Sequence, residues 1–377
     1  MRNYEVVVVG LGAMGSATLS ALARRGRKVI GLDRFEPGHR LGSSYGESRI
    51  IRMAYFEDPA YVPLLRLAYD AWKRLESHTG EQVLTITGIL EAGIPGSELV
   101  EGSLRSALQH DIPHEELLPR QVNKRFPAFS IPPDWHCVLQ PDAGILLPEK
   151  AIDLFVQSAT GFGANVALGT RVERVLTIGD RVEVQLESGE TIEAGSAVLA
   201  AGPWIQELVP ELGSKMTLTR QPLMWFEPQD ERLVRPQSMP VFLFQTPEDV
   251  VYGFPDFRGS GVKAASHRSW GYLKSADEIR AEVSDEEKAH LRRIMDRFIP
   301  AAAGRVRQTH VCIYTRSSDE HFVLGLHPTA PQIVLASPCS GHGFKFASIF
   351  GEILADLATM RATDKPIDFL RPSRLIG

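Results

Sequence analysis

The sequence predicts an α/β protein that combines a parallel sheet with a discontinuous second domain built on a mostly antiparallel sheet. Two observations predict this class. A strand, a glycine-rich turn and a helix follow one another at the start of the chain, and further apolar strands typical of the same sheet return at 197–201 and 333–336. Between these segments the chain alternates as antiparallel strands do, so the first domain is expected to be assembled from separated pieces.

The opening unit has the order of a dinucleotide-binding motif. A β-branched run at 4–9 predicts a strand buried on both faces, the turn GLGAMG occupies 10–15, and an Ala-rich helix is expected at 16–25. A second apolar strand at 29–32 then ends at Asp33, about twenty residues beyond the glycines. This is the arrangement of a Rossmann-like βαβ unit.

Each polar or glycine position in this unit has a chemical reason. Gly10 permits a tight turn, Gly12 lets the backbone approach a pyrophosphate, and Gly15 lets the helix lie close to the strand. The pyrophosphate would face the positive end of the helix dipole. The Asp33 carboxylate can accept both hydroxyls of an adenosine ribose, which favours FAD or NAD over NADP.

The composition excludes several kinds of protein. The chain has 377 residues and a formal net charge of −5, so neither nucleic acid nor an anionic membrane is expected as a partner. The apolar run near the N-terminus contains the glycine turn and is interpreted as a strand, not a secretion signal. Three widely spaced cysteines without a CxxC pair predict a reducing compartment and no metal site. We therefore expect a cytoplasmic protein.

Further along, a polar and glycine-rich composition predicts a long loop at 36–55, and a loop of this length beside the second strand is expected to have a function. A capping box of Ser284 and Glu287 predicts the start of a helix inside the antiparallel region. The remaining predicted elements are helices at 61–75, 147–160 and 346–360, a strand meander at 165–193 with a hairpin at 178–180, and strands at 197–201 and 333–336.

These elements predict two domains. The cofactor domain is expected at 1–81, 145–216 and 320–377, and the substrate domain at 82–144 and 217–319.

Five blocks in this order make the chain resemble one family, the monomeric sarcosine oxidases and N-methyltryptophan oxidases, within the glycine-oxidase-like FAD amine oxidoreductases. The resemblance covers nearly the full length. The blocks are the glycine turn with Asp33; GESRIIR at 46–52; YGFP at 252–255 with Lys263 and His267; CIY at 312–314 with Asp319 and Glu320; and SGHGFKF at 340–346.

The resemblance implies FAD, bound by a Rossmann-like domain and joined covalently through the 8α-methyl of the flavin to Cys312. The alternative for Cys312 is a buried, inert thiol, the usual state of a lone cysteine. The other candidate cofactor-binding residues are Gly10, Gly12, Gly15, Asp33, Ser43, Ser44, Gly202, Gly341, Gly343 and Lys345.

The resemblance also implies which residues bind the substrate. Arg52 and Lys345 would hold a substrate carboxylate, since an arginine offers bidentate geometry and a lysine a point charge. The alternative is a pair of solvated surface charges, although Lys345 lies between two phenylalanines. Tyr314 and Tyr45 are the other candidate substrate-binding residues.

Four residues are expected to contribute to the reaction. Lys263 would stabilise charge that develops on oxygen, and Arg49 would lie close to the flavin ring. Tyr252 and His267 would flank the substrate, with a structural role as the alternative for the histidine.

One departure concerns the block at 46–52, which opens in close relatives with a histidine pair before the glycine. Here Ser44 and Tyr45 stand in that place. The bulkier Tyr45 therefore puts the substrate in question more than the fold.

The predicted function is the FAD-dependent oxidation of a secondary amino acid, with sarcosine as the default substrate. The imine product would hydrolyse to glycine and formaldehyde, and O2 would be reduced to H2O2. The expected partners are a small amino-acid amine and O2, and the expected state is a monomer. Four alternatives remain open: oxidation of a larger amine such as N-methyltryptophan, pipecolate or a fructosyl amino acid; a flavin dehydrogenase with another electron acceptor; a nicotinamide-dependent reductase; and a non-catalytic flavoprotein.

Overall fold

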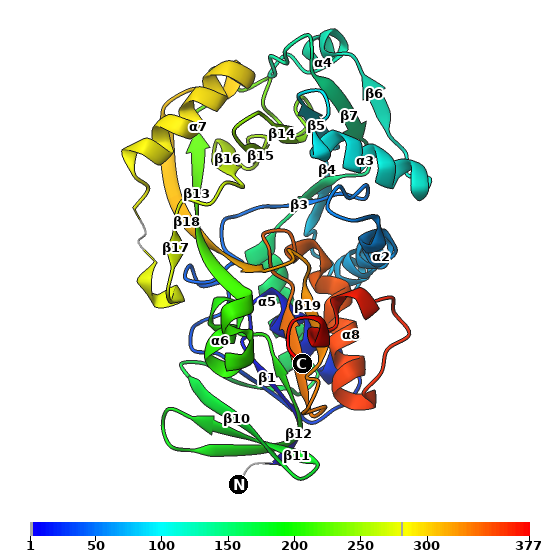
Figure 1. Cartoon of the computed structure of the whole chain (residues 1–377), viewed down its shortest axis with the longest axis vertical. Helices are drawn as coiled ribbons and strands as arrows, with labels where there is room; N and C mark the ends of the chain where they lie inside the picture. The colour runs from blue at the N-terminus through cyan, green and yellow to red at the C-terminus, as the bar shows by residue number, and fades with distance from the viewer. Residues whose placement is uncertain (1–2, 280–281) are drawn as a thin grey trace.

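The computed structural model describes residues 3–279 and 282–377. Figure 1 shows two parts stacked along the long axis, with β1, β10–β12 and α8 in the lower part and α3, α4 and α7 at the top. Residues 1–2 of the predicted cofactor domain and 280–281 of the predicted substrate domain lie outside the described residues.

The lower part is built on an eight-stranded sheet with the order β10-β11-β12-β1-β2-β9, to which β20 and β19 are joined through β12. The pairs among β12, β1, β2 and β9 are parallel, and so is the pair of β12 with β20. The strands are β1 Asn3–Val9, β2 Val29–Leu32, β9 Asn165–Ala167, β10 Val172–Ile178, β11 Arg181–Leu186, β12 Thr191–Leu199, β19 Val323–Leu326 and β20 Ile333–Ser337. The Rossmann-like α/β prediction is confirmed.

Strand β12 is longer than predicted. The sequence pattern separates 191–193 from 197–201, whereas the structure joins them into one strand. Its first half pairs antiparallel with β11, and β1 pairs parallel with it from Glu193 to Leu199. The small residues Ala194, Gly195 and Ser196 weaken the apolar pattern in the middle, which is why the sequence suggests a break.

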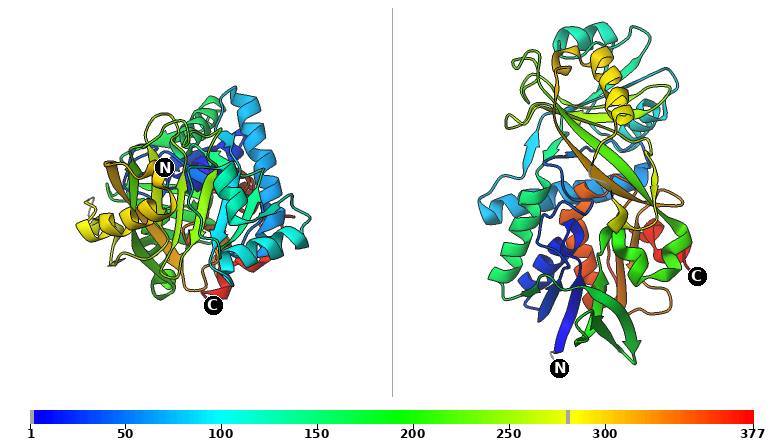
Figure 2. Two further views of the ribbon diagram at one scale, coloured as in Figure 1. Left: turned by 90° about the horizontal axis from the view of Figure 1, so that it is seen from above. Right: turned by 90° about the vertical axis from the view of Figure 1, so that its left-hand side faces the viewer.

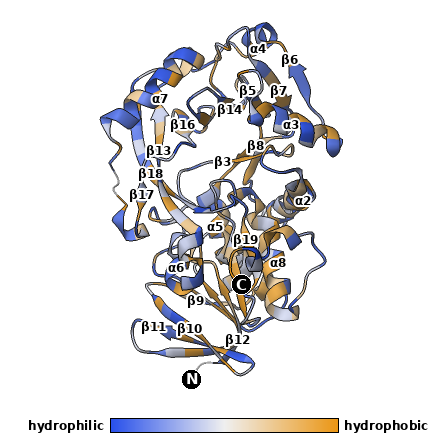
Figure 3. Cartoon of the chain, viewed as in Figure 1, coloured by the Kyte–Doolittle hydropathy of each residue, from blue (hydrophilic) through white to orange (hydrophobic). Residues whose placement is uncertain are grey.

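One face of this sheet is covered by α1 Ala13–Arg24, α5 Pro148–Gly161 and α8 Ala347–Met360, and α2 Val62–Thr79 packs against α8. Strand β1 shows how both faces are buried. Val6 and Val8 pack in the same cluster as the helices, while Val7 and Val9 belong to a second cluster on the other face. Figure 3 shows the apolar strands in the interior and polar residues on the outer helix surfaces.

The glycine turn has the close contacts that its residues predict. Gly10 has a φ of +89°, and a Cβ there would lie 2.5 Å from the Ala200 carbonyl oxygen. A Cβ on Gly15 would lie 1.7 Å from the Gly10 oxygen, so only glycine lets the helix start this close to the strand. Helix α1 begins at Ala13, three residues before the predicted start at Ser16, because the second half of the turn is already helical.

The upper part contains a nine-stranded sheet with the order β17-β13-β16-β15-β14-β5-β7-β6, in which β18 also pairs with β13. Its one parallel pair among the described residues is β5 with β14, so the sheet is mostly antiparallel, as predicted. Its strands are β5 Ile89–Gly93, β6 Glu115–Leu117, β7 His136–Gln140, β13 Met216–Phe226, β14 Val241–Gln245, β15 Val250–Phe254, β16 Val262–Ser266, β17 Tyr272–Leu273 and β18 Val306–Ser317.

Helices α3 Glu98–Gln109, α4 Pro119–Arg125 and α7 Asp285–Phe298 surround this sheet, and Figure 2 shows them at the end of the molecule away from the N-terminus. The predicted capping box is present, since the Ser284 hydroxyl accepts from Glu287 N and the Glu287 carboxylate accepts from Ser284 N. A small antiparallel sheet of β3 Arg49–Ile51, β8 Gly144–Leu146 and β4 Leu84–Ile86 lies between the two parts (Figure 1).

Two long strands, β13 and β18, pair along their whole length and run from the lower part into the upper part (Figure 1). Because β18 carries Cys312 and Tyr314, both residues lie where the two parts meet. The division into a cofactor domain and a substrate domain, with its boundaries, stays a prediction. Within the described ranges, no helix has both the length and the apolar character to cross a bilayer.

Candidate active site

One continuous cavity runs from the glycine turn to the face of the upper sheet. Its walls come from β1, the loop after β2, β3, β15, β18 and the turn after β20. It brings together fifteen of the predicted site residues, which are Gly10, Gly12, Asp33, Ser43, Ser44, Arg49, Arg52, Gly202, Tyr252, His267, Cys312, Tyr314, Gly341, Gly343 and Lys345. Gly15, Tyr45 and Lys263 do not line it.

The first end of the cavity has the features of a dinucleotide site. The buried Asp33 carboxylate is fixed by Leu11 N at 2.6 Å and Phe35 N at 2.8 Å, and burial raises its pKa. A Cβ on Gly12 would point into space, with Ser44 Oγ as its nearest neighbour at 3.6 Å. An open glycine backbone beside a helix N-terminus and a fixed carboxylate fits the pyrophosphate and ribose of FAD.

The polar loop after β2 forms the middle of the cavity, and Arg49 holds it in shape. The Arg49 guanidinium donates to the carbonyl oxygens of Ser43 at 2.8 Å, Tyr45 at 2.6 Å and Ser48 at 2.8 Å. Ser43 Oγ donates to the Ile313 carbonyl at 2.7 Å, which ties the loop to β18.

Cys312 lies in the wall next to this loop. Its Sγ is 3.7 Å from the Ser43 carbonyl oxygen, and its side chain is buried but lines the cavity. Burial raises the pKa of the thiol, while Arg49 and Lys263 act in the opposite direction. The other two cysteines, Cys137 and Cys339, are also buried and free.

Lys263 lies behind the loop and not on the cavity surface. Its ammonium donates to the carbonyl oxygens of Gly46 at 2.6 Å and Ser48 at 3.1 Å, and it lies 4.7 Å from the centre of the Phe254 ring. Burial, and then the nearby Arg49, lower its pKa well below the usual value. The lysine therefore supplies a hydrogen-bond donor directly under the backbone of the cavity wall.

The second end of the cavity is aromatic. The Tyr314 hydroxyl donates to the Tyr252 hydroxyl at 3.3 Å, and the His267 ring lies 4.9 Å from the Tyr252 ring and 5.8 Å from the Tyr314 ring. Burial lowers the pKa of His267 to about 4, so its imidazole is neutral near pH 7. These three side chains form a pocket wall without a positive charge.

A buried polar network fixes the chain around His267. Asp249 accepts from Ser266 Oγ at 2.5 Å and from Arg268 N at 3.2 Å, and its carboxylate lies 2.7 Å from His290 Nε2. His267 N in turn donates to the Val250 carbonyl at 2.8 Å. Residues on both sides of His267 are thereby held to β15.

Arg52 is buried and already neutralised. Its Nη2 lies 2.7 and 2.6 Å from the two Glu57 carboxylate oxygens, and its Nη1 donates to the Ala54 carbonyl at 2.9 Å. Burial acts most strongly on the pKa of Glu57 and raises it, but Arg52, His342 and Lys345 together outweigh burial and hold this pKa at about 2. The predicted carboxylate-binding cation thus has a carboxylate partner within the chain.

Lys345 also lies beside the Tyr55 ring. The Arg52 Cζ is 4.4 Å from the centre of that ring and the Lys345 Nζ is 5.0 Å from it, so both cations converge on one tyrosine. The Lys345 ammonium donates to the His342 carbonyl at 2.6 Å. Burial, and then Arg52, lower the pKa of Lys345 to about 7. Its charge is therefore sensitive to pH near neutrality.

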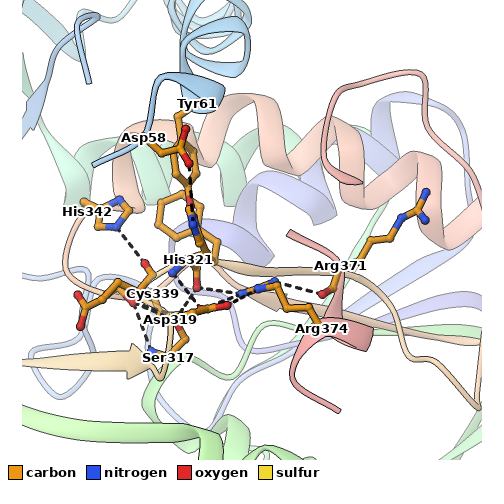
Figure 4. A network of polar contacts seen from close by, with 12 residues as sticks. Asp58, Tyr61, Ser317, Asp319, His321, Cys339, His342, Arg371 and Arg374 are labelled. Atoms are coloured by element: carbon orange, nitrogen blue, oxygen red, sulfur yellow. Dashed lines mark hydrogen bonds and ion pairs between the residues drawn. The ribbon is translucent and has the colours of Figure 1, made fainter. Parts of the chain in front are cut away.

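The turn that carries His342 is supported from two sides. His342 Nε2 lies 3.4 Å from the Glu320 carbonyl oxygen, and Figure 4 shows this contact beside a polar network of Asp58, Tyr61, Ser317, Asp319, His321 and Arg374. Arg374 Nε donates to Asp319 at 2.5 Å, and the Tyr61 hydroxyl lies 3.1 Å from His321 Nδ1. The network joins the end of β18 to the C-terminal segment and to the residues before α2.

Tyr45 lies away from the cavity. Its ring packs edge to face on His310 at 4.6 Å, with the Arg40 guanidinium 4.9 Å from the ring centre. Its main chain still contributes, since its carbonyl accepts from Arg49. The expected contact of the Tyr45 side chain with substrate is therefore not part of this arrangement.

Two acids at the substrate end are not among the residues predicted from the sequence. Glu57 lines the cavity, and Glu91 lies behind Arg52, with 3.7 Å between its Oε1 and Arg52 Nε. Nothing in the sequence distinguishes Glu57 from other acids in polar loops. Glu91 has a signal, because it is a carboxylate in the otherwise apolar strand β5.

The fold and this cavity define a dinucleotide-dependent oxidoreductase with paired cations at the end where a substrate would bind. The comparisons with known proteins agree. The FAD dependent oxidoreductase family matches residues 5–357. The chain belongs to this family and is a flavin-dependent amine oxidase, and its resemblance to the sarcosine oxidase and N-methyltryptophan oxidase group is confirmed.

The similar proteins cover the whole chain. A monomeric sarcosine oxidase from Streptomyces avermitilis is 40% identical over 378 residues, which span 99% of this chain and 98% of that protein. An N-methyl-L-tryptophan oxidase from Yersinia pestis is 31% identical over 370 residues, spanning 97% and 96%. Among solved structures, NikD, an unusual amino acid oxidase essential for nikkomycin biosynthesis, matches with a TM-score of 0.87 at 25% identity, covering 99% of this chain and 98% of its own.

Proposed function

We propose that this protein oxidises the secondary amine of an N-methyl amino acid, with sarcosine as its substrate and O2 as the electron acceptor. The observation that carries the proposal is the convergence of Arg52 and Lys345 on Tyr55, at the cavity end where Tyr252, Tyr314 and His267 also meet. Two cations suit a carboxylate, and a neutral aromatic wall suits an uncharged amine with a small alkyl group. The products would be glycine, formaldehyde and H2O2.

The cofactor in this proposal is FAD, joined covalently to Cys312. When bound, the flavin accepts a hydride from the substrate and passes the electrons to O2. Cys312 supports the assignment because its Sγ faces the cavity beside the loop that Arg49 holds. Asp33 and Gly12 would hold the ribose and the pyrophosphate.

Residues of the chain would bind the substrate and stabilise charge during the reaction. Arg52 and Lys345 would fix the carboxylate, and this orients the substrate α-carbon toward the ring system. His267, which is neutral near pH 7, and the paired hydroxyls of Tyr252 and Tyr314 would accept or donate hydrogen bonds to an uncharged amine. Lys263 would stabilise negative charge that develops on oxygen.

The cavity wall and the relatives support a small substrate as the first candidate. Tyr45, the sequence feature that favoured a larger amine, lies outside the cavity. The relative with the higher identity is named as a sarcosine oxidase, while the N-methyl-L-tryptophan oxidase at 31% identity supports a larger amine as the second candidate. The name of the first relative also supports the proposed monomer.

The test is an anaerobic reduction followed by the admission of air. Purified holoenzyme is mixed with sarcosine, and separately with N-methyl-L-tryptophan, while the visible flavin absorbance is followed and H2O2 is then assayed. Bleaching by sarcosine with recovery and peroxide in air is the expected result. Bleaching by N-methyl-L-tryptophan alone would transfer the proposal to the larger amine. Recovery only with an added artificial acceptor would make the protein a dehydrogenase.

A further inference from the structure

Glu91 is a buried acid that the proposed reaction does not use. It lies on β5 with 0% of its side chain exposed. Its Oε2 accepts from Gln140 Nε2 at 2.7 Å, whereas its Oε1 has no hydrogen-bond partner among the described residues. That Oε1 faces Arg52, with 3.7 Å between it and Arg52 Nε. An uncompensated carboxylate oxygen at this depth is costly unless a charge or a proton balances it.

The guanidinium of Arg52 is therefore shared by two carboxylates. Glu57 contacts Nη2 from the cavity side, and Glu91 faces Nε from the side of the upper sheet. The side chain of Glu57 is 20% exposed, whereas that of Glu91 is completely enclosed. Lys345 is the other cation nearby, with its Nζ 5.0 Å from the centre of the Tyr55 ring. These are the charged groups that Glu91 faces.

A ligand carboxylate at Arg52 would bring a third negative charge to one guanidinium. In a site of low polarity, charges of the same sign repel strongly over these distances. Glu57 stays ionised because its pKa is about 2, and its side chain is partly exposed to solvent. Glu91 cannot leave. Burial raises its pKa to about 7, whereas Arg52 and the side chains of Ser103 and Gln140 act against this shift and Glu57 adds to it.

We propose that Glu91 takes up a proton from solvent when a ligand carboxylate binds at Arg52, so that it is a positioning residue that adjusts the charge of the site. The balance is one carboxylate plus one proton giving one carboxylic acid, with no other reactant. This inference depends on the proposed function, because it requires a carboxylate ligand at Arg52. It predicts that carboxylate affinity falls as pH rises, by a factor set by the number of protons taken up.

The test uses the holoenzyme and methoxyacetate, an ether analogue of sarcosine without an ionisable amine. Calorimetric titrations at pH 8 in two buffers of different ionisation enthalpy give the protons taken up per ligand. Lys345 also takes up protons under these conditions, so the wild type alone does not isolate Glu91. We expect Glu91→Gln, which keeps the shape and the hydrogen bond from Gln140, to lower the uptake by about half a proton or more.

Glu287→Gln is the matched control, because Glu287 on α7 is another buried acid and is paired with an arginine, Arg220 on β13. It should leave the proton uptake unchanged. In the wild type, infrared difference spectra should show the carbonyl stretch of a new carboxylic acid on ligand binding, a signal that a lysine cannot give. This second measurement also serves if Glu91→Gln does not fold.

Two results would overturn the inference. Methoxyacetate that binds with the same proton uptake in Glu91→Gln, and without an infrared acid signal in the wild type, would assign the uptake to Lys345. Methoxyacetate that does not bind at all, seen as no saturable change in the flavin spectrum, would overturn the proposed substrate class together with this inference. Failure of the inference alone is thus distinguishable from failure of the function.

Discussion

The Nη2 atom of Arg52 lies 2.6 and 2.7 Å from the two carboxylate oxygens of Glu57, so the cation proposed to bind a substrate carboxylate is already paired within the chain. An incoming carboxylate has to compete with this internal one. The ligand-free site is thereby stable with its charge buried, at a cost in affinity for the ligand.

Glu57→Gln removes the competitor and keeps the shape of the side chain. Because a hydrogen bond between charged groups contributes about 1.5–3 kcal/mol, we expect methoxyacetate to bind about tenfold more tightly to the variant. Titration of the flavin absorbance at pH 7 gives the Kd. Weaker binding would show that Glu57 instead holds Arg52 in its binding position.

Cys312→Ala tests the covalent attachment of the flavin. The variant should release its flavin into the supernatant on acid or heat precipitation, whereas the wild-type pellet should stay yellow. Cys137→Ala is the control, since Cys137 is equally buried but lies on β7, away from the cavity wall. A coloured pellet from Cys312→Ala would show that the link to the chain lies elsewhere.

Lys263→Met separates the two halves of the reaction. Loss of an ammonium that stabilises developing negative charge typically costs about a hundredfold or more, and we expect this loss in the reoxidation by O2. The anaerobic reduction by substrate should change far less. Stopped-flow absorbance measures both rates. Because the Lys263 ammonium also donates to Gly46 and Ser48, equal losses in both rates would reveal a role in holding this loop.

Asp249→Ala tests the buried network next to His267. The change leaves the Ser266 hydroxyl and His290 without this acceptor, whereas the backbone N–H of Arg268 keeps Ser266 Oγ at 3.0 Å, and we expect the free energy of unfolding to fall by about 3 kcal/mol. Urea unfolding followed by fluorescence measures this. Asp285→Ala is the control, since this side chain is fully exposed, and it should change the free energy of unfolding little.

The cofactor end could be predicted from sequence because its signals are local. The glycines and Asp33 act through turn geometry and spacing, which neighbouring residues fix. The substrate end depends on contacts across the chain, such as Arg52 with Glu91 and Lys345 with Tyr55. No pattern in the sequence reports that Arg52 is internally paired, and the resemblance alone suggested that Tyr45 faces the substrate. The side-chain direction of Tyr45 is set instead by packing on His310.

Lys345→Met tests the pH dependence of carboxylate binding. Burial lowers the pKa of Lys345 to about 7, so the ammonium is charged below that pH and neutral above it. Its attraction for a carboxylate is therefore present at pH 6 and largely lost at pH 9. We expect the variant to bind methoxyacetate about tenfold or more weakly than the wild type at pH 6, and nearly as well as the wild type at pH 9. Flavin absorbance titrations at both pH values give the ratio, with the exposed Lys288→Met as the control. The same ratio at pH 6 and pH 9 would mean that Lys345 acts through shape and not through its charge.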